Sequence, residues 1–344
     1  MVLLHGAYGG PQLLYDVSDP VHPRLLCTIS NTSAHLFTGD TFEYLKPVSS
    51  SETDVILHSL GSGNESVAGS FPFNAVIVSW LPDLSVAAYT LPVPQDSGNF
   101  PAGGVAVYLY SNQQATPLVT YRIGIGDCIC RFGLPPQVLD ISPDGQYVAA
   151  GWESGKGSEP IAVYRVADLR LASSFDTSFS SVFWDRTGHR LFLTRFGNNA
   201  AQQAWTPEGG VADLAGAAAW SYSPGVSPDG SRVAYTAYSD PINFQQLRVY
   251  TYDLKAGTTR MLIDKLRSQV TFVKDGWVWY LEEVACGPTD GCPGSSQPGN
   301  TVYAMNLATG AEQAVSFATG EDPRSQGGVM GWGVVGPGEF WPAS

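Results

Sequence analysis

Two segments of this chain repeat one pattern. "ISPDGQYVAAGW" occupies residues 141–152, and "VSPDGSRVAYTAY" occupies residues 226–238. In both, Ser-Pro-Asp-Gly precedes a run of residues in which apolar side chains alternate. Proline fixes φ in a tight turn, and glycine accepts the positive φ that a side chain resists. Alternation with a period of two indicates a strand with one buried face. Each segment therefore predicts a tight turn followed by a β-strand.

Weaker copies of this pattern occur along the rest of the chain. They occupy residues 37–47, 80–90, 184–195, 272–283 and 334–342. Aligning all copies gives the anchor positions Asp40, Asp83, Asp144, Thr187, Asp229, Asp275 and Pro337, at spacings of 43, 61, 43, 42, 46 and 62 residues. Further alternating segments fill the intervals, which gives four strands in a repeat of about 43 residues. This repeat length and strand number are typical of a β-propeller blade.

The repeat predicts an all-β chain with seven four-stranded blades, with six and eight blades as alternatives. We expect residues 1–344 to form one propeller domain. The predicted blades cover 31–72, 73–122, 135–178, 179–218, 219–266 and 267–317, with a closing blade from 1–30 and 322–344. In the closing blade, residues 11–30 would supply the third and fourth strands, and 328–344 the first and second. Pairing between the two ends of the chain would close the ring and leave no exposed sheet edge at the seam.

The segments Pro143-Asp144-Gly145 and Pro228-Asp229-Gly230 resemble the repeat of TolB-like, or WD40-like Pro-Asp-repeat, propellers. The resemblance covers almost the whole chain, although it is poor at two of the blades. Members of this family bind proteins, cap peptidase domains or degrade oligosaccharides. The resemblance therefore implies a fold and not an activity.

The composition argues against several classes of partner. The formal net charge is -13, whereas nucleic acids and anionic membrane surfaces require a basic stripe. No apolar run approaches the roughly 20 residues of a membrane span. The N-terminal segment "MVLLHGAYGG" also lacks the basic region and cleavage site of a signal peptide. We expect a mature, extracytoplasmic protein that is secreted, periplasmic or on the cell surface, monomeric and without membrane insertion or nucleic acid.

Common catalytic motifs do not occur in the sequence. It contains no Gly-x-Ser-x-Gly elbow, His-Glu-x-x-His zinc motif, phosphate-binding loop or EF-hand loop. The five histidines are His5, His22, His35, His58 and His189, and four of them fall in the first 58 residues. A shared histidine site is conceivable, but scattered surface and strand histidines fit the spacing better. We therefore predict no cofactor and no metal, and the catalytic residues remain unknown.

Four of the five cysteines fall in two long connections. Cys128 and Cys130 lie in one connection, Cys286 and Cys292 lie in the other, and Cys27 stands alone. The spacings fit zinc poorly, so disulfides within or between these loops are the prediction, with free thiols as the alternative. A Cys286–Cys292 bridge would stabilise the fold by about 2 kcal/mol through loop closure. Disulfides would indicate an oxidising compartment.

The candidate ligand site follows from the lengths of the connections. The long insertions all join second to third strands, or fourth strands to the next blade, and these connections share one face of a propeller. Function usually resides in loops held on a rigid scaffold. The residues expected at the rim of this face are Trp152, Glu153, Arg195, Phe196, Tyr238, Asp240, Glu282 and Glu283. Aromatic side chains beside carboxylates and an arginine suit a sugar, a peptide or a cation.

Three functions are compatible with this sequence, and the weakest is a metal-stabilised structural protein that uses the acidic loops or the four loop cysteines. The first is a non-catalytic binding or scaffold propeller that recognises a protein, peptide or glycan on its long-loop face. The alternative is a polysaccharide lyase or glycoside hydrolase that uses carboxylates on the same face, one of them as a general acid.

Overall fold

The computed structural model describes most of the chain. The described residues are 2–6, 12–29, 34–38, 41–73, 76–93, 104–122, 138–154, 157–175, 181–185, 189–194, 202–214, 222–240, 245–287, 296–318, 329–334 and 339–342. They form strands and turns, and no helix occurs among them. The chain divides into two compact units, each considered by itself. The first comprises residues 1–31, 192–204 and 211–336, and the second comprises residues 32–191, 205–210 and 337–344.

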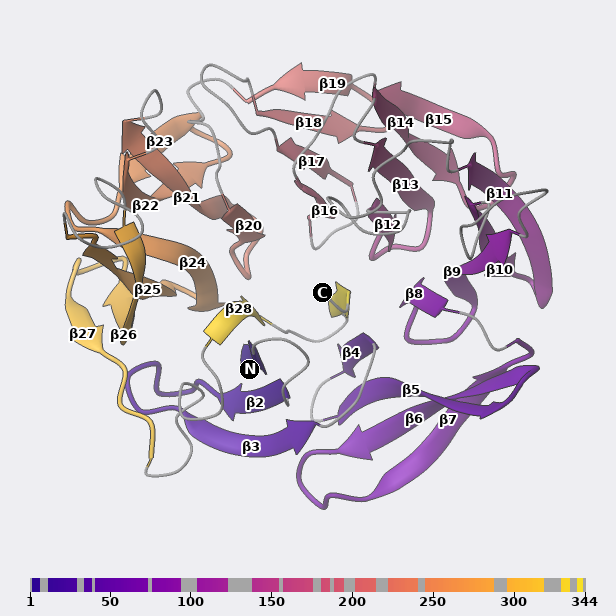
Figure 1. The fold of residues 1–344 in the computed structure, drawn as a ribbon, viewed down its shortest axis with the longest axis horizontal. Helices are drawn as coiled ribbons and strands as arrows, with labels where there is room; N and C mark the ends of the chain where they lie inside the picture. Colours follow the sequence, from indigo (N-terminus) through magenta and orange to yellow (C-terminus); the bar gives the residue numbers. More distant parts are fainter. Residues whose placement is uncertain are drawn as a thin grey trace. The chain divides into compact units, whose positions relative to one another are not determined.

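The strands form seven antiparallel sheets, six with four strands and one with five (Figure 1). The five-stranded sheet has the order β29 (Glu339–Pro342), β4 (Ala34–Thr38), β5 (Thr41–Ser49), β6 (Glu52–Ser59) and β7 (Glu65–Phe71). The next contains β8 (Val76–Trp80), β9 (Val86–Val93), β10 (Gly104–Ser111) and β11 (Gln114–Arg122). The third contains β12 (Val138–Ile141), β13 (Tyr147–Ser154), β14 (Gly157–Arg165) and β15 (Leu171–Phe175).

The remaining sheets follow the same scheme. The fourth contains β16 (Ser181–Trp184), β17 (Leu191–Thr194), β18 (Gln203–Thr206) and β19 (Gly210–Asp213). The fifth contains β20 (Tyr222–Val226), β21 (Arg232–Asp240), β22 (Gln245–Asp253) and β23 (Thr258–Met261), and the sixth contains β24 (Arg267–Lys274), β25 (Trp277–Ala285), β26 (Ser296–Asn306) and β27 (Glu312–Ala314). The seventh has the order β28 (Val329–Val334), β1 (Val2–Gly6), β2 (Gln12–Asp16) and β3 (Arg24–Ile29). Seven sheets of this kind confirm the predicted all-β, seven-bladed propeller class.

The two ends of the chain share a sheet, but the number of strands that each end contributes differs from the prediction. β28 pairs with β1, so the C-terminal segment contributes one strand to this sheet and the N-terminal segment contributes three. The two-plus-two division predicted from sequence was therefore wrong. β29 instead pairs with β4, where Phe340 lies opposite Leu36. The segment 2–6 reads Val-Leu-Leu-His-Gly, so it lacked the alternation on which the strand prediction relied.

The two Ser-Pro-Asp-Gly turns fold in the same way. In the first, the Ser142 hydroxyl donates to Asp144 Oδ1 at 2.6 Å and accepts from the Tyr147 amide at 2.9 Å. In the second, Ser227 bonds to Asp229 and to the Arg232 amide at the same two distances. The glycines that follow have φ of 72° at Gly145 and 70° at Gly230. The motif therefore builds its turn from side-chain hydrogen bonds and a left-handed glycine.

The core of each unit lies between neighbouring sheets. In the second unit, the strand that follows the first turn buries Val148 and Ala150 against Val107 and Leu109 of β10. In the first unit, Ala234 of β21 packs with residues of the next sheet: Phe272, Val278, Tyr280, Met305 and Leu307. The alternation seen in the sequence thus supplies the face that packs one sheet on the next.

Candidate functional site

The predicted rim residues that are described lie near the ends of second strands. Trp152 and Glu153 fall near the end of β13 in the second unit, in register with Glu159 and Ser158. In the first unit, Tyr238 and Asp240 occupy the end of β21, and the Tyr238 side chain is half-buried. Arg195 and Phe196 lie outside the described residues. Whether these side chains form one site stays a prediction.

Glu283 is a buried carboxylate at the end of β25. Only 7% of the residue is exposed, and its amide donates to the Leu266 carbonyl at 3.2 Å. Carboxylate oxygen Oε1 accepts a short hydrogen bond from the Ser268 hydroxyl. The other oxygen, Oε2, is buried and has no hydrogen-bond partner among the described residues. An unpaired buried acceptor is unfavourable by about 1–3 kcal/mol, more when it is charged, so a donor to this oxygen would be stabilising.

Glu282 and Glu283 leave opposite faces of β25, as period two requires. Glu283 continues the row of Trp279 and Leu281, which packs in the core, whereas Glu282 is half-buried and lies opposite Arg267. The Glu282 side chain crosses over Gly299, where an added Cβ would lie 2.8 Å from Glu282 Cγ. Two adjacent carboxylates therefore have different surroundings, and Glu283 is the one with an unused acceptor.

Cys286 follows β25 and is disulfide-bonded. Its partner is not among the described residues, because Cys27 is the other described cysteine and has a free thiol. Cys128, Cys130 and Cys292 lie outside the described residues, so the predicted pairing with Cys292 stays a prediction. Burial raises the pKa of the Cys27 thiol to about 11.

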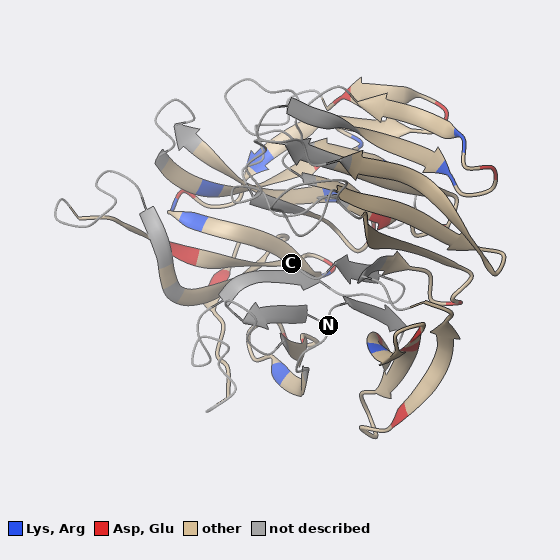
Figure 2. Cartoon of the chain, turned by 45° about the vertical axis from the view of Figure 1, so that its right-hand side comes forward, with Lys and Arg blue, Asp and Glu red and all other residues tan. Residues whose placement is uncertain are grey.

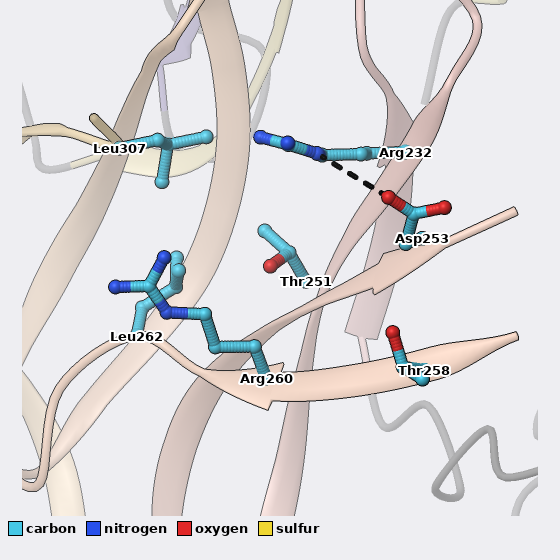
Figure 3. A pocket seen from close by; sticks show the side chains of 7 residues that line it. All are labelled: Arg232, Thr251, Asp253, Thr258, Arg260, Leu262 and Leu307. Atoms are coloured by element: carbon cyan, nitrogen blue, oxygen red, sulfur yellow. Dashed lines mark ion pairs between the residues drawn. The ribbon is translucent and has the colours of Figure 1, made fainter. Parts of the chain in front are cut away.

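The sequence did not predict a pocket of about 140 Å³ at the opposite end of β21 (Figure 3). It is lined by Arg232, Thr251, Asp253, Thr258, Arg260, Leu262 and Leu307, which together are called the arginine pocket below. β21 begins at Arg232 and ends at Asp240, so this pocket and the predicted rim lie at opposite ends of one strand.

Strand register explains why these residues meet. Arg232 pairs with Asp253, and Asp253 pairs with Thr258, which forms one row across three strands. Thr251 pairs with Arg260 in the next row on the same face, since side chains two apart along a strand share a face. Alternation within "TYD" and "TTR", on either side of a short turn, is the signal that could have indicated this face.

Two acids in the second unit link neighbouring sheets: Glu43 is buried and Asp140 is half-buried. The Ser79 hydroxyl of β8 donates to Asp140 Oδ1 of β12 at 3.1 Å, and Trp80 Nε1 donates to Glu43 Oε2 at 3.0 Å. Burial raises the pKa of Asp140 to about 7, although hydrogen bonds from Ser79 and Ile141 favour its charged form. Burial likewise raises the pKa of Glu43, opposed by the bond from Trp80. Because each acid has a protein partner, we assign both to the scaffold.

A second arginine cluster lies in the sheet next to the arginine pocket. Arg267 is 6% exposed and its Nη2 lies 2.8 Å from Glu312 Oε1, while Lys265 Nζ donates to Glu312 Oε2 at 2.6 Å. The Tyr280 hydroxyl donates to the same Oε1 at 3.2 Å, and burial beside Glu312 raises the pKa of Tyr280. Although burial opposes it, bonds from Lys265 and Arg267 hold the pKa of Glu312 below its usual value. The cluster is internally satisfied and has a structural role.

Charged residues of both signs are distributed over strands and turns (Figure 2). Within the described residues, no three His, Cys, Asp or Glu side chains gather where they could hold a metal ion. The described part of the chain also contains no helix of the length and apolarity needed to cross a membrane.

Comparisons with known proteins support the fold. No protein-family model matches the chain, and no curated protein matches it in sequence. Among solved structures, a prolyl endopeptidase is similar with a TM-score of 0.54 and 14% identity, over 89% of this chain and 46% of that one. An oligogalacturonate lyase from Vibrio parahaemolyticus has a TM-score of 0.51 and 10% identity, over 82% and 88%. TolB from Acinetobacter baumannii has a TM-score of 0.42 and 16% identity, over 76% and 62%.

These structural neighbours are propeller-containing proteins with different activities. This chain spans less than two thirds of the TolB and endopeptidase chains that it matches. At identities this low, similarity establishes a shared fold and leaves both a binding and an enzymatic propeller open.

Proposed function

We propose that this chain is a non-catalytic binding propeller that recognises a protein, peptide or glycan where the second strands of its blades end. The observation that carries this proposal is the buried carboxylate of Glu283, whose Oε2 has no hydrogen-bond partner among the described residues. A ligand N–H or O–H group would supply the missing donor. Amines, amides and sugar hydroxyls all have such donors, and they match the aromatic and carboxylate character of the predicted rim.

Tyr238 and Asp240 hold the equivalent position at the end of the second strand in the preceding sheet. A half-buried tyrosine offers both an apolar ring and a hydroxyl, the combination that is enriched at binding surfaces. Trp152 and Glu153 hold this position on β13 in the second unit. The proposal includes an extracytoplasmic location, which the disulfide of Cys286 favours because such bonds persist in oxidising compartments.

The test compares two neighbouring carboxylates. The purified protein would be screened on glycan and peptide arrays, and the strongest ligand titrated against Glu283→Gln and Glu282→Gln. Glu283→Gln keeps the shape of the side chain but can replace an acceptor oxygen with an NH₂ donor. We expect at least a tenfold weaker Kd for Glu283→Gln, since a lost charged hydrogen bond is worth about 1.5–3 kcal/mol. The Glu282→Gln variant tests the adjacent rim carboxylate and should weaken binding less than Glu283→Gln does. Glu52→Gln, at an exposed acid in the other unit, is the control and should bind within about twofold of the parent.

Equal binding by the parent and Glu283→Gln would overturn the proposed site. If Glu283→Gln does not fold, Ser268→Ala provides a second variant, because it removes the donor to Oε1 and leaves the carboxylate in place. Incubation with polygalacturonate and other glycans, followed by product analysis, tests the alternative. A product formed by the parent and not by Glu283→Gln would identify a carbohydrate-active enzyme instead of a binding module.

A further inference from the structure

We propose that the arginine pocket is a separate binding site for a carboxylate attached to a short apolar group. It lies at the opposite end of β21 from Tyr238 and Asp240, so it does not depend on the function proposed above. Figure 3 shows Thr251 between the two arginines, with Arg232 extending toward Leu307.

Arg260 is an exposed residue with no acid partner in the described part of the chain. In six ion pairs, an arginine or lysine nitrogen lies within 3.8 Å of a carboxylate oxygen. No acid in the described part of the chain lies within 4.0 Å of Arg260. An unpaired guanidinium offers a planar set of N–H donors that matches the two oxygens of a carboxylate.

Arg232 is only loosely paired. Its Nε lies 4.0 Å from Asp253 Oδ2, which is too long for a hydrogen bond. Asp253 is already engaged in the turn, where its Oδ1 accepts from the amides of Lys255 at 3.0 Å and Ala256 at 2.8 Å. The pocket therefore contains two arginines and one acid, which gives it a net positive charge in an acidic protein.

Thr251 supplies a hydroxyl to the pocket. Only 7% of the residue is exposed, and it is one of the residues that line the pocket. Placed between two guanidinium groups, this hydroxyl can donate to the same oxyanion.

Leu262 and Leu307 favour a ligand that has an apolar group next to its carboxylate. Both belong to the apolar cluster between this sheet and the next, and they form the apolar part of the pocket lining. A methyl or ethyl group next to the carboxylate would contact them, whereas a phosphate or sulfate would leave them covered only by polar oxygens. A pocket of about 140 Å³ suits a short organic acid or the C-terminal residue of a peptide.

The experiment follows the Nε–Hε resonances of arginine by NMR while sodium propionate is added to the full chain at constant ionic strength. We expect saturable shifts of two resonances, which are assigned by their absence in Arg232→Gln and Arg260→Gln. Propionate should bind at least tenfold more weakly to Arg260→Gln and severalfold more weakly to Thr251→Val. Arg170→Gln is the matched control, because Arg170 is an exposed, ion-paired arginine in the other unit, and this variant should bind as the parent does.

Separate titrations distinguish the sources of the carboxylate. An acetylated Ala-Ala peptide with a free C-terminus is compared with its C-terminal amide. Tighter binding of the free peptide than of propionate would support a peptide terminus, and the reverse would support a small organic acid. The proposal is overturned if no shift saturates, if Arg260→Gln binds propionate as the parent does, or if inorganic phosphate binds as tightly as propionate.

Discussion

Two arginine-containing regions in adjacent sheets differ in how completely their polar groups are satisfied. Arg267 donates to Glu312 and to the Leu266 carbonyl, and its guanidinium carbon lies 4.3 Å from the centre of the Tyr303 ring. Arg260, in the preceding sheet, lies beside a pocket and has no acid partner in the described part of the chain. Type of residue alone does not distinguish them. The unused donors and the adjacent space identify Arg260 as part of a candidate site.

The largest effect is predicted for a substitution that breaks the ion pair between Arg267 and Glu312. Arg267→Gln should lower the free energy of unfolding by about 3 kcal/mol, because it leaves the buried Glu312 without its main partner. Arg260→Gln should change it by less than about 0.5 kcal/mol, since Arg260 is exposed and has no acid partner in the described part of the chain. Urea unfolding of both variants gives the comparison. A destabilisation of similar size in the two variants would mean that the arginine pocket is also structural.

A second prediction concerns Asp140, a half-buried acid that has a partner. The pKa of Asp140 is raised to about 7 in the folded protein, so the folded state binds this proton more tightly than the unfolded state. The contribution of Asp140 to the free energy of unfolding should therefore be largest below about pH 4 and fall by about 2–4 kcal/mol as the pH rises to 7.

Asp140→Asn should remove this contribution. The measurement is urea unfolding of the parent and Asp140→Asn at pH 5 and pH 7.5, because their difference cancels the other titrating groups. The parent should lose more stability than the variant over this interval. An identical loss in both proteins would show that Asp140 titrates as an ordinary surface acid.

The smallest effects concern the two Ser-Pro-Asp-Gly turns. Gly230→Ala should destabilise the fold by about 1–2 kcal/mol, because a left-handed φ is unfavourable with a side chain and no atom lies near the added Cβ. Gly145→Ala should cost a similar amount, since the atom nearest its added Cβ, Leu81 Cδ1 at 2.6 Å, is the end of a half-buried side chain that can move aside. Thermal unfolding of both variants tests this, and a loss below about 0.5 kcal/mol at either glycine would contradict the need for a left-handed residue there.

The fold was predictable because the turn motif acts locally. Ser142, Asp144 and Gly145 form their turn with hydrogen bonds over five residues or fewer, and the strand that follows alternates. Weaker copies were harder to recognise for a physical reason. Leu84 takes the place of the glycine with φ of 59°, and Asp83 still holds the turn through the Ser85 amide and hydroxyl.

The candidate sites could not be predicted from the repeat, because they depend on how neighbouring strands pair. Thr251 and Arg260 are brought together by the register between β22 and β23. Asp253 is held by the turn amides through Oδ1, and its other oxygen lies 4.0 Å from Arg232 Nε. The sequence could indicate that Glu282 and Glu283 face opposite ways. Which of them is buried beside Ser268 depends on how β24 and β25 pair.

The central claim is that this propeller binds its ligand without changing it. The most direct test is to incubate the protein with the strongest array ligand, isolate the complex by native mass spectrometry, denature it and weigh the released ligand. The account predicts release at unchanged mass from the parent and little retention by Glu283→Gln. A ligand released in cleaved or dehydrated form by the parent would contradict it and identify an enzyme.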